Sequence, residues 1–265
     1  QCLCILRQLV ATGKPLSTVG MRIEDRTRTY TIAMERTVVP ENFSFRMTDE
    51  EYRVLEKIKN SIPVCYLADH ADFALGIVTG NNKKFLSAEK TQHSEMVLKG
   101  TDICKYHINP VKQYLRFEPE QFQQVAPLEI YRAPEKLLYR FISNQLVVAY
   151  DDRQMLSLNS CNIVIPKIEG MQIKYILAIL NSSVSQFVYQ KEFHSIKVLR
   201  AHMEHIPIPR VGKAIQNEII AMTEPLICGM GKEAAETCQK RLDCRIMDLF
   251  RLSAEEQWII RHALH

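Results

Sequence analysis

Apolar residues recur at helical spacing in the second half of the chain. Between residues 172 and 190 they fall on one stripe, formed by Ile173, Ile176, Leu177, Leu180, Val184 and Phe187. Spacings of three and four residues are typical of a helix that buries one face. The pattern therefore predicts a single helix over residues 172–190, and helices over about 213–227 and 231–250.

Two capping signatures mark further helix starts. Thr48 is followed three residues later by Glu51, and Ser253 in the same way by Glu256. In this arrangement the hydroxyl accepts from the amide of the third residue, whose carboxylate accepts from the first amide. We expect a helix from residue 48 to about residue 60 and a last helix after Ser253. The residues expected on the buried face of the first are Tyr52, Leu55 and Ile58.

Strand patterns dominate residues 64–168. Short β-branched runs at 147–150 and 162–165 are bounded by polar turns, as strands usually are. Residues 134–139 fit either a short helix or an edge strand. Nearer the N-terminus we expect a helix over 1–16 and strands at 19–23 and 29–34.

Together these elements predict an α+β fold, in which a mixed-strand domain is followed by a C-terminal helical segment. The expected divisions are an N-terminal segment (1–45), a strand-rich domain (46–210) and a helical region (211–265). Because the chain opens without a start methionine on a helix-like segment, we expect it to be the C-terminal part of a longer protein.

Composition and charge narrow the function classes only a little. Of 265 residues, 46% are hydrophobic and 24% charged, which is ordinary for a soluble globular protein. A net charge of +4 and a pI of about 8.6 permit nucleic-acid binding without demonstrating it. No apolar run approaches the ~18–20 residues that cross a bilayer, so no membrane partner is expected. Eight cysteines without a C-x-x-C pair favour buried, reduced thiols in a cytoplasmic protein.

Signatures of catalysis and metal binding are missing from the sequence. The sole G-x-G, at residues 229–231, lies between helical segments and lacks the third glycine of a nucleotide-binding turn. The densest histidine group, His194, His202 and His205, comes without further metal-ligand spacing, so surface or backbone-bonded histidines are expected. We expect neither catalytic residues nor metal ligands here.

Acidic residues in the middle of the chain do not form a nuclease motif. The candidates are Glu129, Asp151, Asp152 and Glu169. A nuclease carboxylate set of this kind has a lysine at a fixed spacing beside its paired carboxylates, and that spacing is missing from the sequence. Adjacent aspartates in a turn are the simpler interpretation of Asp151 and Asp152.

Two polar, basic loops that contain glycine stand out instead. Residues 76–85 (GIVTGNNKKF) run from a strand into a Gly-Asn-Asn turn that carries two lysines, and residues 98–106 (LKGTDICKY) repeat the order Lys-Gly-polar-Lys. Glycine and asparagine permit left-handed backbone in such turns. Asparagine can pair with adenine through two hydrogen bonds, while lysine neutralises phosphate. The two loops suggest a nucleic-acid contact.

The order of these elements resembles a known family. Residues from about 64 to 210 are similar to the Taq-type specificity domain, the target-recognition domain of adenine-N6 DNA methyltransferases and fused restriction–modification enzymes. The matching stretches are 76–83 (GIVTGNNK), 99–103 (KGTDI), 134–140 (PEKLLYR), 146–151 (LVVAYD), 175–182 (YILAILNS), 193–200 (FHSIKVLR) and 206–209 (IPIP). The tail from residue 241 to 256 is similar to the closing helices of such enzymes.

The resemblance implies sequence-specific recognition of double-stranded DNA without catalysis in this chain. The catalytic half of the family, with its cofactor-binding glycine motif and N-P-P-Y-type tetrapeptide, has no counterpart here. S-adenosylmethionine is therefore expected only in an N-terminal methyltransferase domain of the same protein, of which residues 1–45 would be the trailing end or the linker. An endonuclease domain fused to that parent protein is also compatible with the family.

Basic and amide side chains on the loops are the expected DNA contacts. They are Thr79, Gly80, Asn81, Asn82, Lys83, Lys84, Lys99, Lys105, Arg132, Lys136, Lys197 and Arg200. Arg140 is a further basic residue, for which an ion pair with Asp151 is the alternative to a DNA contact. Two other functions stay open: a helical protein-interaction module of a specificity subunit, and an enzyme with an unrecognised carboxylate–histidine site.

Overall fold

The computed structural model describes residues 20–24, 29–33, 47–193 and 195–264. Contacts within the chain divide it into two units, residues 1–57 and residues 58–265. In the first unit, β1 (Gly20–Glu24) and β2 (Thr29–Ala33) form an antiparallel pair in which Gly20 lies opposite Ala33. Both strands agree with the prediction, whereas the helix predicted over 1–16 lies outside the described residues.

Helix α2 (Asp49–Asn60) begins where its capping signature predicts. The amide of Glu51 donates to the Thr48 hydroxyl at 3.1 Å, and the amide of Thr48 donates to the Glu51 carboxylate at 2.9 Å. Leu55 and Ile58 are buried as expected, while Tyr52 is only half-buried. The reciprocal cap satisfies two amides that the first turn of a helix leaves without a partner.

The second unit is an α+β fold, as predicted, and its described residues contain ten short strands. They are β3 (Val64–Cys65), β4 (Ala71–Ala74), β5 (Leu86–Ser87), β6 (Ser94–Leu98), β7 (Tyr114–Arg116), β8 (Lys136–Arg140), β9 (Val148–Asp151), β10 (Leu156–Ser157), β11 (Cys161–Pro166) and β12 (Ile208–Pro209). The central sheet has the order β4-β11-β8-β9 and is antiparallel throughout, and a distal sheet has the order β10-β6-β7-β5. Strands β12 and β3 form a separate pair.

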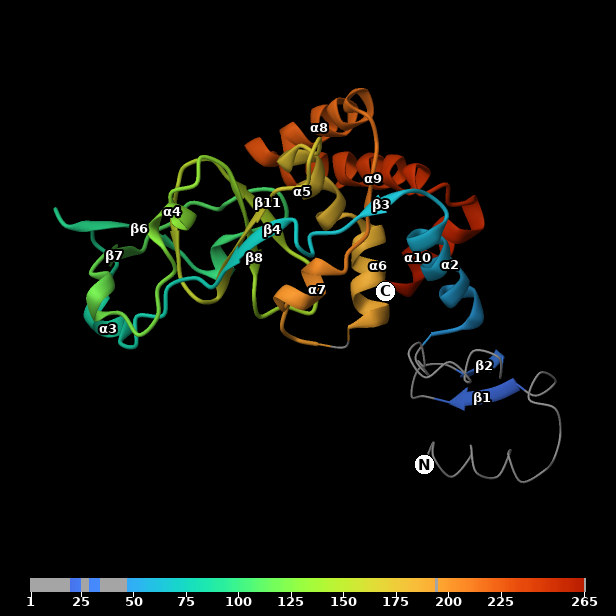
Figure 1. Ribbon diagram of the computed structural model, residues 1–265, viewed down its shortest axis with the longest axis horizontal. Coiled ribbons are helices and arrows are strands. Elements are labelled where there is room, and N and C mark those ends of the chain that lie inside the picture. The colour runs from blue at the N-terminus through green and yellow to red at the C-terminus, as the bar shows by residue number, and fades with distance from the viewer. Residues whose placement is uncertain (1–19, 25–28, 34–46, 194, 265) are drawn as a thin grey trace. The chain divides into compact units, whose positions relative to one another are not determined.

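Helices fill the rest of this unit. They are α3 (Asn82–Phe85), α4 (Leu128–Tyr131), α5 (Ile173–Asn181), α6 (Ser183–Glu192), α7 (Arg200–Glu204), α8 (Lys213–Cys228), α9 (Lys232–Leu249) and α10 (Ala254–Ala263). Figure 1 shows the central sheet between the distal sheet on one side and the helices α5, α6, α8 and α9 on the other. The three C-terminal helices match their predicted ranges closely.

The two faces of the central sheet bury different partners. Leu138, Ala149 and Ile163 point into a core shared with the distal sheet, which contributes Val97 and Leu115. Side chains alternate between the faces of a strand, so the neighbouring positions face the opposite way, where α5 packs against β8 and β9. The central sheet is thus covered on both faces, which explains the nearly continuous burial of β8, β9 and β11, while the edge strand β4 is half-buried.

Two local expectations were wrong. Residues 134–139 were expected to form a short helix or an edge strand, but β8 is an interior strand paired with β11 and β9. Residues 172–190 were expected to form one helix, but Ser182 separates α5 from α6. Ser182 is extended (φ −69°, ψ 159°), and its hydroxyl accepts from the amide of Ser185, so it caps a new helix. The apolar stripe continues across this break.

Candidate nucleic-acid interface

Residues 79–84, within the first predicted loop (76–85), form a tight and mostly exposed turn before β5. Gly80 has a φ of +73°, which favours glycine. The Thr79 side chain is buried and its hydroxyl donates to the Asn82 side-chain oxygen at 2.6 Å, and the Asn81 side-chain oxygen accepts from the Lys84 amide at 3.2 Å. Thr79 and Asn81 thereby hold the short helix α3 in place. Lys83 is left exposed at the turn.

A second loop, residues 119–124, lies directly beside this turn. Val78 and Gln124 exchange two backbone hydrogen bonds of 2.9 and 3.1 Å, and Lys84 donates to the Gln121 side chain at 2.6 Å. Sequence reasoning missed this second loop. Its signal, the three glutamines at 121, 123 and 124, carries no indication that the loop pairs with Val78.

The loop at residues 99–105 is tied to the protein more tightly than expected. The Lys99 amide donates to the Asp102 carboxylate at 2.7 Å within a single 3-10 turn. The Lys105 ammonium donates to the carbonyl oxygen of Asn181 at 3.0 Å, at the end of α5. Burial lowers the pKa of Lys105, an effect that nearby Asp243 opposes. Lys105 thus faces the helices of this unit, whereas Lys99 is half-buried.

Each predicted loop, 76–85 and 98–106, has at or near its start a glycine that fits closely against the same turn. A Cβ atom on Gly76 would overlap the carbonyl oxygen of Leu158, and a Cβ atom on Gly100 would overlap that of Ser160. In addition, the Gly100 amide donates to the Ser160 hydroxyl at 3.0 Å. The turn between β10 and β11 therefore fixes the starting points of the two loops relative to each other.

The lysine at the start of β8 is occupied by structural contacts. Lys136 is fully buried, where its ammonium lies 2.5 Å from the Asp151 carboxylate and donates to the Tyr131 carbonyl at 2.6 Å. It lies directly opposite Asp151 in the β8–β9 register, which removes it from any DNA-facing surface. Burial lowers the pKa of Lys136, against the opposing effect of Asp151.

Arg140 and Arg132 also form contacts within the protein. The expected alternative of an Arg140–Asp151 ion pair is wrong, because Asp151 pairs with Lys136 at the other end of β8. Arg140 donates instead to the carbonyl oxygens of Gly100 at 2.9 Å and Ile103 at 2.6 Å. Arg132 pairs with Glu95 at 2.6 Å and donates to the Gln154 carbonyl at 2.8 Å. Arg132 keeps some exposure, but its charge is compensated.

Lys197 and Arg200 lie at a different place, where two loops meet. Ile142 and Lys197 form a β-bridge, supported by hydrogen bonds from Ser143 to Ile196 at 2.9 Å and from Val198 to Phe141 at 2.8 Å. Lys197 is exposed, with its ammonium 5.8 Å from the centre of the Phe141 ring. Arg200, at the start of α7, forms an ion pair with Glu204 at 2.7 Å and lies over the Phe73 ring.

The predicted residues therefore do not form one cluster. Within the described residues, the exposed basic candidates without an acidic partner are Lys83, Lys84 and Lys197. Figure 1 shows α3, which carries Lys83 and Lys84, and α7, which follows Lys197, along the same lower side of the second unit.

The histidines and cysteines have structural surroundings. His202 accepts from the Leu199 amide at 3.2 Å and stacks on Phe193, and His205 lies 2.6 Å from the Ala201 carbonyl. This agrees with backbone-bonded histidines, while His194 lies outside the described residues. Within the described residues, all six cysteines are free; Cys65 and Cys161 are buried as expected, but Cys228 and Cys244 are exposed.

The described parts of the chain contain neither a metal-binding cluster nor a membrane-spanning helix. They hold no group of three or more His, Cys, Asp or Glu side chains that could bind a metal ion. None of their helices has both the length and the hydropathy of a membrane span.

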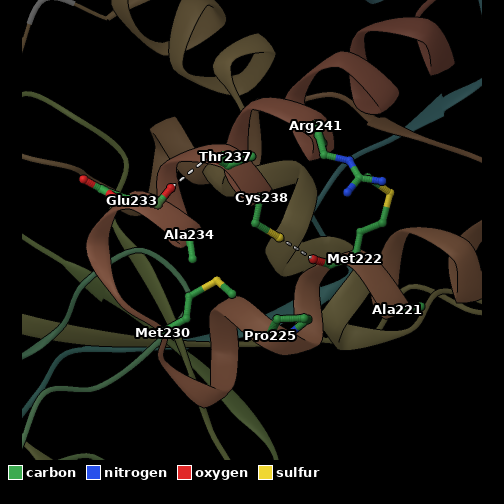
Figure 2. Close-up of a pocket in the computed structure, with 9 residues that line it drawn as sticks. All are labelled: Ala221, Met222, Pro225, Met230, Glu233, Ala234, Thr237, Cys238 and Arg241. Atoms are coloured by element: carbon green, nitrogen blue, oxygen red, sulfur yellow. Dashed lines mark hydrogen bonds between the residues drawn. The ribbon is translucent and has the colours of Figure 1, made fainter.

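A groove lies between the two longest C-terminal helices. Figure 2 shows its lining, contributed by α8, α9 and the turn between them: Ala221, Met222, Pro225, Met230, Glu233, Ala234, Thr237, Cys238 and Arg241. The Cys238 thiol donates to the Met222 carbonyl at 3.3 Å, which joins the two helices beside the groove. The lining is mostly apolar, and Met230 is 38% exposed.

Comparison with known proteins identifies part of this unit. Residues 95–208 match the family described as the TaqI-like C-terminal specificity domain. This match confirms the resemblance seen in the sequence over those residues. No curated protein matches the chain.

Solved structures match this chain at low sequence identity, and one of them reaches a TM-score above 0.5. The type IIL restriction-modification enzyme MmeI in complex with DNA matches with a TM-score of 0.51 and 10% identity, over 78% of this chain and 37% of that one. The HsdS subunit from Thermoanaerobacter tengcongensis has a TM-score of 0.40 and 14% identity, over 82% and 50%. A type I R-M system structure has a TM-score of 0.42 and 13% identity, over 87% and 50%. The chain spans half or less of the length of these structures.

Proposed function

Because residues 95–208 match the TaqI-like C-terminal specificity domain, we propose that this chain recognises a target sequence in double-stranded DNA. It would act as the specificity part of an adenine-specific methyltransferase or of a restriction–modification enzyme. The family match is the observation that carries this proposal. The proposal is also supported by the similarity in fold between this chain and MmeI, whose structure was solved in complex with DNA.

The charges on the surface suit such a role. Lys83, Lys84 and Lys197 lack acidic partners among the described residues, so their charges are available to phosphate groups. Phosphate contacts position a protein on the duplex and make its affinity depend on salt. The buried Lys136 is excluded from this set.

In this proposal, methyl transfer takes place in another domain. S-adenosylmethionine and the catalytic residues would lie in a methyltransferase domain outside these 265 residues. Extrusion of a target base costs a few kcal/mol, which phosphate contacts made by a separate clamping domain would offset. The cytoplasm, where bacterial DNA lies, is the corresponding location.

A salt series on DNA binding tests the proposal. The chain is titrated into labelled duplexes of random sequence, and binding is followed by fluorescence anisotropy between about 50 and 200 mM salt, the range in which phosphate contacts change affinity strongly. The double variant Lys83→Glu/Lys84→Glu should weaken binding and reduce the salt slope by about 2. Lys232→Glu/Lys240→Glu, at two exposed lysines of α9, is the control with the same change in charge.

Two results would count against the proposal. If the wild-type chain does not bind duplex DNA at the lowest salt, the chain is not a DNA-binding module. If the double variant and Lys197→Glu both bind like the wild type, then DNA binding uses a different face.

The groove between α8 and α9 favours a second function, that of a protein-interaction module. Its apolar lining around Met222, Pro225 and Met230 (Figure 2) would hold the methyltransferase domain or subunit of the same system. Light scattering on a mixture of the chain and that polypeptide should show a complex, which Met230→Asp weakens. Met230 is exposed, so this change should leave folding intact. A complex of unchanged stability would exclude the groove.

A further inference from the structure

Two loops that are distant in the sequence form one exposed tip. Residues 79–84 and 119–124 are joined by the two backbone hydrogen bonds between Val78 and Gln124 and by the bond from Lys84 to Gln121. The tip presents amide side chains, those of Asn81, Asn82, Gln121 and Gln123 among them. Amide side chains can read adenine in the major groove when both their oxygen and their nitrogen are available.

The amides differ in whether local contacts already occupy them. The Asn81 oxygen accepts from the Lys84 amide at 3.2 Å, and the Asn82 oxygen accepts from the Thr79 hydroxyl at 2.6 Å. Each of these side-chain oxygens stabilises the turn, so a contact with a base would compete with its hydrogen bond. The loop loses its geometry if either oxygen turns away.

Gln121 is occupied at both ends of its amide group. Its oxygen accepts from the Lys84 ammonium at 2.6 Å, and its nitrogen donates to the Glu118 carboxylate at 2.7 Å. Gln121 therefore holds the two loops together, and a two-bond contact with a base would compete with these hydrogen bonds.

Gln123 and Gln124 are different because neither side-chain amide has such a contact, and of the two only Gln123 lies beside Gly80 of the first loop. The Gln123 side chain is exposed, and no hydrogen bond joins it to the described residues. It lies beside Gly80, where a Cβ atom would come within 3.4 Å of the Gln123 Cβ. A Cβ atom there would only touch Gln123, so position 80 requires glycine for its φ of +73° and not for space. Lys83 and Lys84 stand on the adjacent turn, without acidic partners among the described residues.

We infer that Gln123 is a base-reading residue, which pairs with an adenine in the major groove through its oxygen and its nitrogen. This inference rests on the proposed DNA-binding function. Lys83 and Lys84 would hold the phosphate groups beside that base, so that position and sequence are read at the same tip. Sequence reasoning assigned the amide contacts to Asn81 and Asn82, whose oxygens are engaged in the turn.

A binding-site selection tests the role of Gln123. The full chain selects from a pool of duplexes with a randomised centre, and the bound sequences are read for the wild type, Gln123→Ala and Gln123→Glu. In the wild type we expect one position to require adenine. Gln123→Ala should lower that preference by about 5- to 150-fold, and Gln123→Glu should move it toward cytosine, whose amino group donates to a carboxylate. The other positions should stay the same.

Gln154→Glu supplies a control with the same change in charge. Gln154 is exposed and precedes β10, which lies at the opposite edge of the distal sheet from β5, the strand that follows α3. This variant should keep the whole wild-type motif. Thermal unfolding of each variant should match the wild type, since the Gln123 side chain makes no hydrogen bond with the described residues of the folded protein.

The outcomes separate this inference from the proposed function. A wild-type motif that both Gln123 variants retain would overturn the role of Gln123 and leave DNA recognition standing. A motif that changes with Gln124→Glu and not with Gln123→Glu would also overturn it, in favour of the neighbouring glutamine. Failure of the wild type to enrich any sequence would overturn sequence recognition itself, and the inference with it.

Discussion

The side-chain amide of Asn181 forms two hydrogen bonds with the backbone of Val148, donating to its carbonyl at 2.8 Å and accepting from its amide at 3.0 Å. Val148 belongs to β9, the last strand of the central sheet, whose outer edge has no neighbouring strand within that sheet. Asn181 is fully buried and ends α5. Tyr106 bridges the same edge at Ala149, and its amide donates to the Val148 carbonyl at 2.7 Å. The Asn181 amide supplies the partner of the Val148 amide and fixes the end of the helix that covers the sheet.

Replacement of Asn181 by leucine should destabilise the protein by about 1–3 kcal/mol, because the Val148 amide becomes buried without a partner. Urea denaturation measures the free energy of unfolding. Asn144→Leu, at an exposed position, is the control and should change it by less than about 0.5 kcal/mol. Equal stability of the two variants would show that the edge of β9 does not depend on Asn181.

Removal of the buried ion pair between Lys136 and Asp151 should lower the stability of the protein without a specific loss of DNA binding. Lys136→Met leaves the Asp151 carboxylate without its cation and should cost about 3–5 kcal/mol. Lys197→Met changes an exposed side chain, so its stability should match the wild type while its DNA affinity falls. Denaturation and anisotropy on both variants test this. A stable Lys136→Met variant with weakened DNA binding would contradict the assignment of Lys136 to the core.

The close fit of Gly76 predicts a large difference between two serine substitutions. Gly76→Ser places a Cβ atom on the carbonyl oxygen of Leu158, so we expect a protein that is insoluble or destabilised by several kcal/mol, on the order of the larger single-site effects. Gly212 precedes α8 with open space around it, and serine suits this capping position. Gly212→Ser should therefore be neutral or slightly stabilising. Soluble yield and melting temperature compare the two.

Because the pKa of His202 is lowered in the folded protein, the stability of the protein should depend on pH. Burial lowers the pKa of His202, and His205 adds to this effect, while a backbone hydrogen bond opposes it. As the pH falls from above about 6.5, the unfolded chain takes up the proton first, so the stability present at neutral pH is lost on acidification. Protonation would also prevent the ring nitrogen from accepting the Leu199 amide.

The comparison of pH 7.5 with pH 5.5, chosen as values roughly one unit on either side of the usual histidine pKa, isolates this contribution. His202→Asn keeps an acceptor near the Leu199 amide and does not titrate, so it should lose less stability on acidification than the wild type. Denaturant midpoints at both pH values provide the measurement. An identical loss in both proteins would assign the acid sensitivity to other groups.

Features that depend on neighbouring residues were predictable from the sequence. The caps at Thr48 and Ser253 involve atoms only three residues apart, and both form as expected. The ranges of α8 and α9 follow from their apolar spacing. The break at Ser182 was missed because it leaves the apolar stripe intact, and only the capping hydroxyl and the sheet contact of Asn181 show where α5 ends.

Features that depend on strand register were not predictable. Lys136 meets Asp151 because β8 and β9 pair in one particular register, and a shift of one residue in either strand would turn its side chain to the other face. In the same way, the contact between residues 79–84 and 119–124 arises from pairing across about forty residues of sequence. The sequence could indicate that the first loop is polar and basic, but it could not indicate which loop stands beside it.

The fit of Gly76 and Gly100 against the turn at Leu158 and Ser160 has a consequence for evolution. The roots of the two loops are held by close contacts with backbone atoms, which do not depend on the residues at the loop tips. New side chains at exposed positions of these loops that have no role in the turn, such as 83, would then change the preferred target while the scaffold stays constant. Under the proposed function, the lineage that carries this chain could acquire new target sequences through a few tip substitutions, and libraries for engineering could be confined to the same positions.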